Sequence, residues 1–562
     1  MRGLALGACA LAACGLADAG LARPPVFDAG PTAGADGGAL SHLGGDGGTD
    51  GRCGPCGRAC DGAETCVDDA CVPRAGAPRL LAPVSLGRLT SQRPTLRWLS
   101  PAGVGEARVQ VCRDRACGDV VQSADATGRS LRLPAALAPG VYFWRVFAKR
   151  DGAVAAEPSA TWEFRVRAHD AAVDTNIGGL VDFDGDGYGD LVVGTSMPQR
   201  VGLYMGGPGG VPTAPTGAVP QNADGTSESV STAGDLNGDG YGDLLSFEQA
   251  GGARRVVLHP GGPRGAAAPA VTLTASDPWP DTLGSAGDVD GDGYGDLVGV
   301  DAGGGGPPGQ VRVFFGGPAG VRPLSAVMIP GDADTASGLV STGGGDLNGD
   351  GRPDFLFGMP SGADGAGRAV AWVNGGCGVG RVVALPGDAT AFAHFGDALS
   401  LGGDFDGDGY ADAVVAAPHD ASAVDQSALW IFPGGADGPV TASPRRIPFA
   451  GRQTENIRLI GSGDLNGDGY ADLGAWMHTD LRPTEMLLFY GSATGLPAAP
   501  ARALGHGDYG PDETGFGVGF AGDPDRDGFD DLTVFLSPGR VVISRGSPDG
   551  PIAGNLPGLV LP

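Results

Sequence analysis

The sequence predicts an all-β protein, with a seven-bladed β-propeller preceded by a β-sandwich domain and a small Cys-rich segment. Three observations support this prediction: a nine-residue aspartate-rich segment recurs seven times, a glycine turn follows each copy, and short strand-like runs lie between them. The copies begin at Asp182, Asp235, Asp288, Asp346, Asp404, Asp464 and Asp523. A repeat of 53 to 60 residues that holds about four short strands is typical of a propeller blade.

Residues 1–14 have the pattern of a bacterial signal peptide with a lipobox. Arg2 precedes a short apolar stretch, and Leu11-Ala12-Ala13-Cys14 matches the site at which Cys14 would be lipidated. An ordinary cleaved signal peptide with an incidental cysteine is the alternative. Both interpretations predict an exported protein. Lipidation would anchor it to the cell envelope, at the outer membrane or cell surface, and cleavage alone would secrete it.

Two short segments follow the signal peptide. Residues 15–50 are rich in Gly, Ala and Asp, a composition typical of a flexible tether. Residues 51–75 contain the five cysteines Cys53, Cys56, Cys60, Cys66 and Cys71. In an exported chain this density predicts a disulfide knot, with a Cys₄ zinc site as the alternative. Because five is odd, one thiol is free or pairs at a distance, and Cys377 is a candidate partner.

Residues 78–167 contain strand-like runs at the spacing of a β-sandwich. The runs are residues 94–98, 107–111, 140–146 and 162–166. They resemble a fibronectin type III domain, in which their aromatic side chains would form the core. Cys112 and Cys117 flank a four-residue hairpin loop, so we expect a disulfide between them.

Residues 170–562 hold the seven aspartate-rich loops, numbered one to seven in chain order. Each loop has Asp or Asn at positions 1, 3, 5 and 9 and glycine at position 6. Ca²⁺ takes six to eight oxygen ligands from carboxylates, amides and carbonyls, and glycine accepts the positive φ of a tight turn. Position 7 varies, as expected if it supplies only its carbonyl. The loops therefore predict up to seven Ca²⁺ sites.

The predicted ligands occupy positions 1, 3, 5, 7 and 9 of each loop. They are Asp182, Asp184, Asp186, Tyr188 and Asp190 in loop one; Asp235, Asn237, Asp239, Tyr241 and Asp243 in loop two; Asp288, Asp290, Asp292, Tyr294 and Asp296 in loop three; Asp346, Asn348, Asp350, Arg352 and Asp354 in loop four; Asp404, Asp406, Asp408, Tyr410 and Asp412 in loop five; Asp464, Asn466, Asp468, Tyr470 and Asp472 in loop six; and Asp523, Asp525, Asp527, Phe529 and Asp531 in loop seven. Loop four, with Asn348, Arg352 and Pro353, is expected to bind most weakly.

Two other interpretations of the loops are disfavoured. An EF-hand needs a glutamate at position 12 and flanking helices, whereas position 12 here is never Glu and its surroundings are strand-like. Ordinary acidic hairpin turns also favour Asp-Gly and Asn-Gly. That interpretation does not account for seven copies with a fixed aspartate at position 9.

The repeats resemble the FG-GAP repeats of the integrin α-subunit β-propeller. Phe395-Gly396 and Phe516-Gly517 precede loops five and seven, and Ala416-Ala417-Pro418 stands near the Gly-Ala-Pro position. Elsewhere the Phe-Gly pair is degraded, as in Leu283-Gly284. In that family the calcium loop joins the first two strands on the lower face. The resemblance therefore implies that a ligand meets the opposite face.

Composition excludes two classes of partner. The net charge is −28, and positions 1, 3, 5 and 9 of the loops hold 25 of the 65 carboxylates, so seven divalent ions would halve that charge. No Lys/Arg stripe is present to neutralise phosphates, so we expect no nucleic acid. No apolar run reaches the length of a membrane span. Any contact with a membrane would be through the lipid anchor alone.

Scattered histidines and the lack of HExxH and GxSxG motifs argue against an enzyme. Two functions remain open: a surface binding or adhesion module for an unknown protein or glycan, and a purely structural envelope lipoprotein. A hydrolase or lyase acting on polysaccharide or lipid is a weaker alternative. Residues predicted in the upper connections are Trp279, Phe392, His394, Arg452 and Tyr509. Local packing is the favoured interpretation of these side chains.

Overall fold

The protein is all-β in a computed structural model that describes residues 52–53, 58–59, 64–67, 70–74 and 76–560 apart from short connections. Those connections are residues 197–198, 220–225, 251–252, 266–270, 274–279, 281, 302–308, 323–324, 330–339, 362–364, 377–379, 388–392, 419–426, 450–455, 480–481, 510–515, 537–539 and 555. The predicted signal peptide with Cys14 and the tether lie outside the described residues, as do Cys56, Cys60 and Cys377.

The described residues contain strands and a single 3₁₀ turn, η2 (His506–Asp508), and no α-helix. This confirms the predicted all-β class. Within this part of the chain, no helix has the length and hydropathy needed to cross a bilayer.

The Cys-rich segment forms two small hairpins. β1 (Arg52–Cys53) pairs with β2 (Arg58–Ala59), and β3 (Glu64–Val67) pairs with β4 (Ala70–Pro73). Cys66 and Cys71 both take part in disulfide bonds, so these two cysteines follow the disulfide prediction rather than the zinc alternative. Arg79 ties the second hairpin to the next domain, because its Nη1 donates to Oε1 of Glu64 at 2.5 Å.

Two packed sheets form the predicted sandwich. One has the order β10 (Ser130–Arg132), β7 (Thr95–Leu99), β5 (Arg79–Ala82). The other has the order β14 (Asn176–Gly179), β6 (Gly87–Leu89), β13 (Trp162–Val166), β11 (Gly140–Arg150), β8 (Glu106–Cys112), β9 (Val120–Thr127), and β12 (Ala153–Pro158) pairs with β11. The core between them contains Trp98, Trp144 and Trp162. Cys112 and Cys117 form the expected disulfide.

Seven successive antiparallel sheets follow, which we call blades one to seven. They are β15 (Leu191–Ser196), β16 (Gln199–Tyr204), β17 (Gly217–Ala218); β18 (Thr226–Gly234), β19 (Asp243–Ala250), β20 (Ala253–His259), β21 (Val271–Thr272); β22 (Thr282–Gly287), β23 (Asp296–Asp301), β24 (Gln310–Phe314), β25 (Ser325–Ile329); β26 (Val340–Gly345), β27 (Asp354–Met359), β28 (Arg368–Asn374), β29 (Gly380–Leu385); β30 (Leu399–Gly403), β31 (Asp412–Ala417), β32 (Ala428–Phe432), β33 (Arg445–Pro448); β34 (Asn456–Gly463), β35 (Asp472–Thr479), β36 (Arg482–Phe489), β37 (Arg502–Gly505); and β38 (Phe516–Gly522), β39 (Asp531–Leu536), β40 (Arg540–Ser544).

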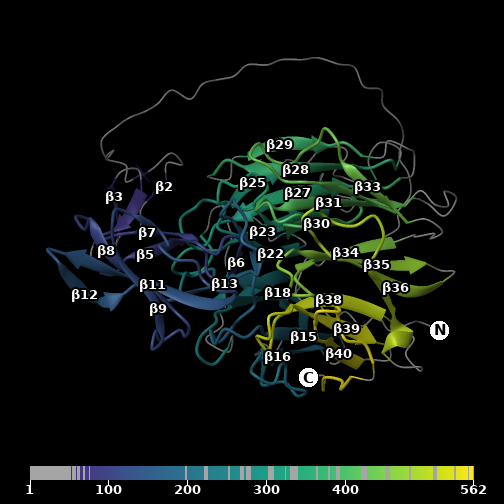
Figure 1. The fold of residues 1–562 in the computed structure, drawn as a ribbon, viewed down its shortest axis with the longest axis horizontal. Helices are drawn as coiled ribbons and strands as arrows, with labels where there is room; N and C mark the ends of the chain where they lie inside the picture. The colour runs from purple at the N-terminus through teal and green to yellow at the C-terminus, as the bar shows by residue number, and fades with distance from the viewer. Residues whose placement is uncertain are drawn as a thin grey trace, which may run out of the picture.

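The blades fan around a common centre, with the sandwich against one side of the fan (Figure 1). The innermost strands β18, β22, β26, β30, β34 and β38 contact one another in that order. From blade two onward, each aspartate loop joins the innermost strand to the second strand, which begins at position 9 of the loop. These second strands are short apolar runs such as β31, which is buried along its whole length. Burial on both faces explains why such a run is continuously apolar rather than alternating.

The boundary predicted between residues 167 and 170 falls inside the sandwich sheet. β14 precedes loop one, where blade one would have its innermost strand, yet β14 pairs with β6 of the sandwich. It also contacts the innermost strands β26 and β30. The sandwich sheet therefore extends into the centre of the propeller.

The ring closes through contacts between blades seven and one. Gly189 N donates to Asp523 O at 3.2 Å, and Gly207 N donates to Pro524 O at 2.9 Å. The last described residues run beside β40, where Val542 and Gly558 form an isolated bridge. Tyr204 Oη of blade one donates to Val560 O at 2.6 Å. Among the described residues, closure uses these contacts and no exchanged strand.

Backbone hydrogen bonds also join each loop to its neighbour. The amide at position 8 of one loop donates to the carbonyl at position 1 of the preceding loop. The pairs are Gly242 with Asp182, Gly295 with Asp235, Ala411 with Asp346, Ala471 with Asp404, Asp530 with Asp464, and Gly189 with Asp523. Loop four has Pro353 at position 8 and no amide to donate. The loops therefore form a nearly continuous hydrogen-bonded ring on one face of the propeller.

Candidate metal centres on one face of the propeller

Each loop is a set of turns in which side-chain carboxylates accept hydrogen bonds from nearby backbone amides. In loop one, Asp182 accepts hydrogen bonds from Gly185 N at 2.5 Å and Gly187 N at 2.7 Å. Asp186 Oδ1 accepts from Tyr188 N at 2.9 Å. Both glycines have positive φ, 72° at Gly185 and 88° at Gly187, which glycine adopts without steric cost. The sequence therefore curls so that its carboxylates converge.

The aspartate at position 9 comes from the start of the second strand and ties the loop together. In loop five, Asp412 accepts hydrogen bonds from Phe405 N and Gly434 N, both at 2.9 Å. Equivalent pairs of bonds hold the position 9 aspartates of loops one to six, since position 2 supplies an amide in each of them. In loop seven position 2 is Pro524, and the buried Asp531 Oδ2 has no hydrogen-bond partner.

Carboxylates at positions 1 and 9 are buried in nearly every loop. Asp182 is 1% exposed, Asp190 2%, and Asp243, Asp296 and Asp354 0%. Burial raises the pKa of these groups above the usual range of aspartate: to about 7 for Asp243 and to about 8 for Asp354. Burying carboxylates without a countercharge is costly. A bound cation supplies that countercharge, so this donor set fits a hard divalent metal ion.

Four loops bring three carboxylates within 4.8 Å of one another. The groups are Asp182, Asp184 and Asp190; Asp288, Asp290 and Asp296; Asp404, Asp406 and Asp412; and Asp523, Asp525 and Asp527. Loops one, three and five thus join positions 1, 3 and 9, and Asp186, Asp292 and Asp408 lie outside those groups. Loops two, four and six have Asn at position 3, where the amide oxygen of Asn237, Asn348 and Asn466 takes the place of a carboxylate oxygen.

Arginine side chains form their closest ion pairs with the predicted ligand carboxylates in loops three and seven. In loop three, Arg322 pairs with Asp290 at 3.4 Å and also with Asp292. In loop seven, Arg545 pairs with Asp525 at 2.9 Å, and Arg165 of the sandwich pairs with Asp523 at 2.8 Å. In loop four, by comparison, Arg352 lies 3.9 Å from Asp350. A guanidinium group paired with a ligand carboxylate competes with a metal ion for that carboxylate. We therefore expect metal binding to be weakened most at loops three and seven.

The side chain at position 7 has a role that the sequence did not reveal. A Cβ atom added to Gly238, the position 4 glycine of loop two, would lie 2.9 Å from the ring of Tyr294 in loop three. Tyr410 packs in the same way on Gly349, Tyr470 on Gly407, and Phe529 on Gly467. The ring at position 7 therefore packs on the preceding loop. In these loops glycine at position 4 therefore suits the packing of the ring as well as the positive φ, whereas loop seven has Arg526 at this position.

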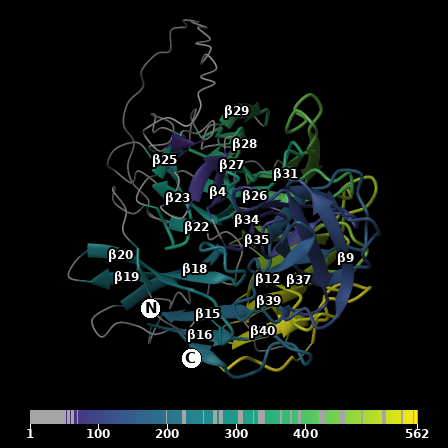
Figure 2. The same cartoon turned by 90° about the vertical axis from the view of Figure 1, so that its left-hand side faces the viewer.

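The sandwich domain lies against one side of the propeller (Figures 1 and 2), and its side chains contact several of the aspartate loops. Arg115 Nε donates to Gly185 O of loop one at 2.9 Å. The guanidinium of Arg115 also lies 3.9 Å from the ring centre of Tyr241 in loop two. Trp162 Nε1 donates to Gly238 O, also in loop two, at 3.1 Å.

The linker after the sandwich reaches loops five and six. His169 Nε2 lies 2.9 Å from Gly407 O of loop five, and its ring stacks on Tyr470 of loop six, with centroids 4.7 Å apart. Thr175 Oγ1 donates to Gly409 O. The sandwich and its linker thus bind mainly to loop carbonyls, and they leave the ligand carboxylates of loop five without an ion pair from the sandwich.

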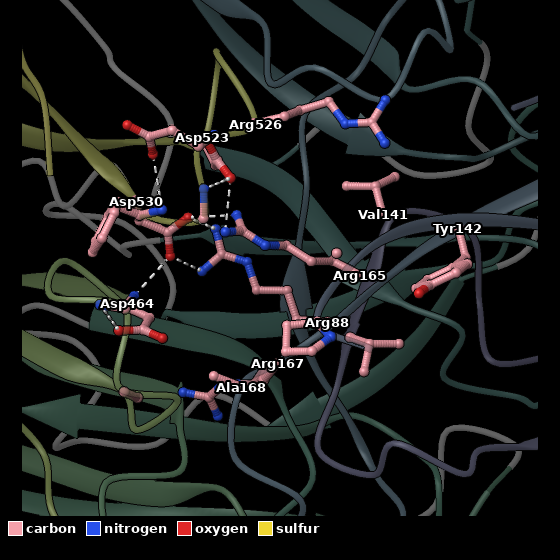
Figure 3. A pocket seen from close by; sticks show the side chains of 18 of the residues that line it. Arg88, Val141, Tyr142, Arg165, Arg167, Ala168, Asp464, Asp523, Arg526 and Asp530 are labelled. Atoms are coloured by element: carbon pink, nitrogen blue, oxygen red, sulfur yellow. Dashed lines mark hydrogen bonds and ion pairs between the residues drawn. The ribbon is translucent and has the colours of Figure 1, made fainter. Parts of the chain in front are cut away.

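At loop seven the sandwich binds the carboxylates themselves. Arg88 Nη1 and Arg165 Nη1 contact Asp530 at 2.9 and 3.1 Å, and both arginines point toward Asp530 from the same side (Figure 3). Asp530 is 1% exposed. Burial acts to raise the pKa of Asp530, but the two guanidinium groups outweigh burial and lower it. These residues line a cavity of about 520 Å³ between the sandwich and loops six and seven, together with Arg167 and Asp464.

Comparisons with known proteins identify the repeats that contain these aspartate loops. The model of the FG-GAP-like repeat matches residues 182–246 and 404–475. Integrin alpha pat-2 of Caenorhabditis elegans is 30% identical over 155 residues, which cover 23% of this chain and 12% of that protein. Integrin alpha-4 of Xenopus laevis is 31% identical over 143 residues, which cover 24% and 14%. The chain thus carries FG-GAP repeats and spans about an eighth of the length of these curated relatives.

Two solved structures also align with the chain. The structure of the Dos1 propeller aligns over 85% of this chain and 88% of its own, with 10% sequence identity and a TM-score of 0.35. A structure of BBS1N in complex with ARL6DN aligns over 66% of this chain and 93% of its own, with 11% identity and a TM-score of 0.38.

Proposed function

We propose that this protein is an exported, calcium-stabilised binding module whose propeller presents the face opposite the aspartate loops to a protein or glycan ligand. The observation that carries the proposal is the position of the sandwich domain. Contacts from Arg115, Trp162, Arg165 and His169 place the sandwich and its linker on the loop face. A partner therefore has the other end of the propeller available to it.

Calcium would act here as a structural ion. The convergent, buried carboxylates of loops one, three and five supply the oxygen donors that Ca²⁺ prefers. A cation bound there would neutralise charge at the junction between the first and second strands of each blade and would stabilise the folded state by mass action. The FG-GAP repeats support the same assignment, because their resemblance to integrin α-subunits implies divalent-cation loops.

The five residues predicted to contact a ligand fall into three groups. Tyr509 is buried, and its hydroxyl lies 3.3 Å from Ser544 Oγ, so local packing accounts for it. His394 is partly buried at positive φ beside Phe395. Trp279, Phe392 and Arg452 lie outside the described residues. The proposed ligand surface therefore rests on the blade connections as a group rather than on one side chain.

An enzymatic role finds no support in the Ser–His contact of blade two. Ser246 Oγ lies 2.8 Å from His259 Nε2, the separation of a nucleophile and its base. Both residues are buried, at 2% and 0% exposure, and burial lowers the pKa of His259 to about 4. The pair therefore packs inside a blade, where a substrate does not reach it.

A binding array tests the proposal most directly. The purified full chain would be applied to glycan and protein arrays in calcium and again in EDTA. We expect a ligand signal that weakens in EDTA, together with calcium found by elemental analysis and a lower melting temperature after chelation. A chain that contains no calcium and melts at the same temperature in EDTA would contradict the calcium assignment. A folded chain with no array signal would favour a structural envelope protein.

The cellular location depends on Cys14. We propose that Cys14 carries a lipid and that residues 15–50 separate the folded domains from the membrane. The change Cys14→Ala should release the protein into the soluble fraction and leave its calcium content unchanged. A wild-type protein without lipid by mass spectrometry, with a mature N-terminus beyond residue 14, would show that the protein is secreted instead.

A further inference from the structure

Glu163 is a carboxylate of the sandwich domain that lies against loop one. It is on β13, and its backbone carbonyl accepts a hydrogen bond from Leu86 N at 2.8 Å. The side chain is 1% exposed, and its carboxyl group lies beside that of Asp182, the first ligand of loop one. Its Oε2 atom has no hydrogen-bond partner. Two acidic side chains from different domains are therefore buried together.

The nearby arginines do not supply the missing partner. Arg115 uses Nε, Nη1 and Nη2 on the carbonyls of Gly185, Thr161 and Gly240. Arg526 Nη1 is 3.5 Å from Asp186 O. Glu163 and Asp182 share a side-chain hydrogen bond, and ionising both buried carboxyl groups side by side is costly because the two charges have the same sign. A cation between Glu163 and Asp182 removes that cost.

We propose that Glu163 helps to bind the cation of loop one, so that this ion links the sandwich domain to the propeller. This inference rests on the proposed calcium-binding function and adds to it a ligand from outside the repeat. Loop one then has five carboxylates near its ion: Asp182, Asp184, Asp186, Asp190 and Glu163. Glu163 lies outside the group of three that converge within 4.8 Å, as Asp186 does. Calcium affinity rises with the number of charged ligands, so loop one holds the tightest ion of the seven.

Calcium titration of the metal-free full chain by calorimetry tests the proposal. We expect Glu163→Gln to weaken the tightest site about tenfold, a ratio that calorimetry resolves. The control Glu157→Gln, an exposed glutamate of the same domain, should leave every site unchanged. Glu163→Gln with the affinities of wild type would overturn the proposal, because it would show that Glu163 does not contribute to calcium binding. Wild type that binds no calcium would contradict the proposed function itself.

Hydrogen–deuterium exchange of the wild-type chain gives a second test that does not depend on a variant folding. Adding calcium should slow exchange in β13 as well as in loop one, because one ion holds both. Asp404→Asn, which alters loop five alone, should leave that protection of β13 intact. Protection confined to loop one would overturn the proposal.

Discussion

Loops five and seven have the same nine-residue pattern but different surroundings. In loop five, Asp412 is held by two backbone amides, and the sandwich linker forms hydrogen bonds with the carbonyls of Gly407 and Gly409. In loop seven, Pro524 has no amide to donate, so Asp531 Oδ2 has no hydrogen-bond partner. Arg165 and Arg545 form ion pairs with Asp523 and Asp525. The same motif therefore has different contacts in the two loops. The ligand carboxylates of loop five remain available to a metal ion, whereas Asp523 of loop seven forms an ion pair with Arg165 of the sandwich.

The sandwich attachment at loop seven depends most on Asp530. We expect Asp530→Ala to lower the free energy of unfolding by about 3 kcal/mol, because it leaves the guanidinium group of Arg88 without its carboxylate and removes one of the two carboxylates that pair with Arg165. Urea denaturation measures this change, and limited proteolysis reports whether the sandwich separates from the propeller.

Asp125→Ala is the matched control for this variant. It removes a carboxylate at the surface that pairs with Arg108 and with Lys149, and the side chains of Asp125 and Arg108 are about 40% exposed. Exposed pairs contribute little, so the urea midpoint should not move. Equal behaviour of the two variants would contradict the assignment of loop seven as the attachment point.

The number of bound calcium ions should also differ between variants of loop five and variants of loop seven. Asp404→Asn should remove one bound calcium ion, as counted by native mass spectrometry at low calcium concentration. Asp523→Asn should remove none under the same conditions, since Arg165 and Arg545 already pair with the carboxylates of loop seven. The loss of one ion from both variants would show that the arginines yield to the metal, and the difference between the loops would then disappear.

Several features of the loops could be predicted from the sequence because their chemistry is local. Nine residues contain the donors, the glycines and the turn, so the spacing of Asp404, Asp408 and Asp412 was enough to identify the candidate site. The four runs predicted for the sandwich also correspond to strands β7, β8, β11 and β13. The order of blades follows from the period of the repeat.

The contacts of the sandwich with the loops could not be predicted in this way. Arg88 and Asp530 are 442 residues apart, and Arg165 and Asp530 are 365 residues apart. No periodic pattern connects such positions. One signal was present: position 8 is Gly, Ala or Pro in six loops and Asp530 in loop seven. A charged residue at a position where the other loops have small residues indicates a contact with something outside the repeat.

Stability should depend on pH in the metal-free protein. Burial first, and then neighbouring aspartates, raise the pKa of Asp531 to about 8. A carboxyl group whose pKa is higher in the folded state binds a proton more tightly there, so its contribution to stability is fully present below about pH 4 and is lost as the pH rises toward 8. In EDTA the melting temperature should therefore fall between pH 5 and pH 8, and calcium should reduce this fall.

Asp531→Asn sharpens the pH comparison. The amide does not ionise, so in EDTA the variant should lose less stability than wild type between pH 5 and pH 8. Asp119→Asn replaces a carboxylate whose side chain is 66% exposed and serves as the control. Identical pH profiles for Asp531→Asn and wild type would indicate that Asp531 is already ionised and partnered in the metal-free state.

The smallest expected effect comes from Arg545 at loop seven. Its side chain is 49% exposed and lies 2.9 Å from Asp525, so the ion pair is weak and screened. Arg545→Gln should raise the calcium affinity of loop seven severalfold, since it frees Asp525 and removes a positive charge from the site. Arg540→Gln, at the start of β40, which ends one residue before Arg545, is a control because it changes net charge by the same amount away from the ligand carboxylates. An affinity gain in both variants would mean that overall charge sets the affinity; a gain in Arg545→Gln alone would show that a single guanidinium group limits metal binding at this loop.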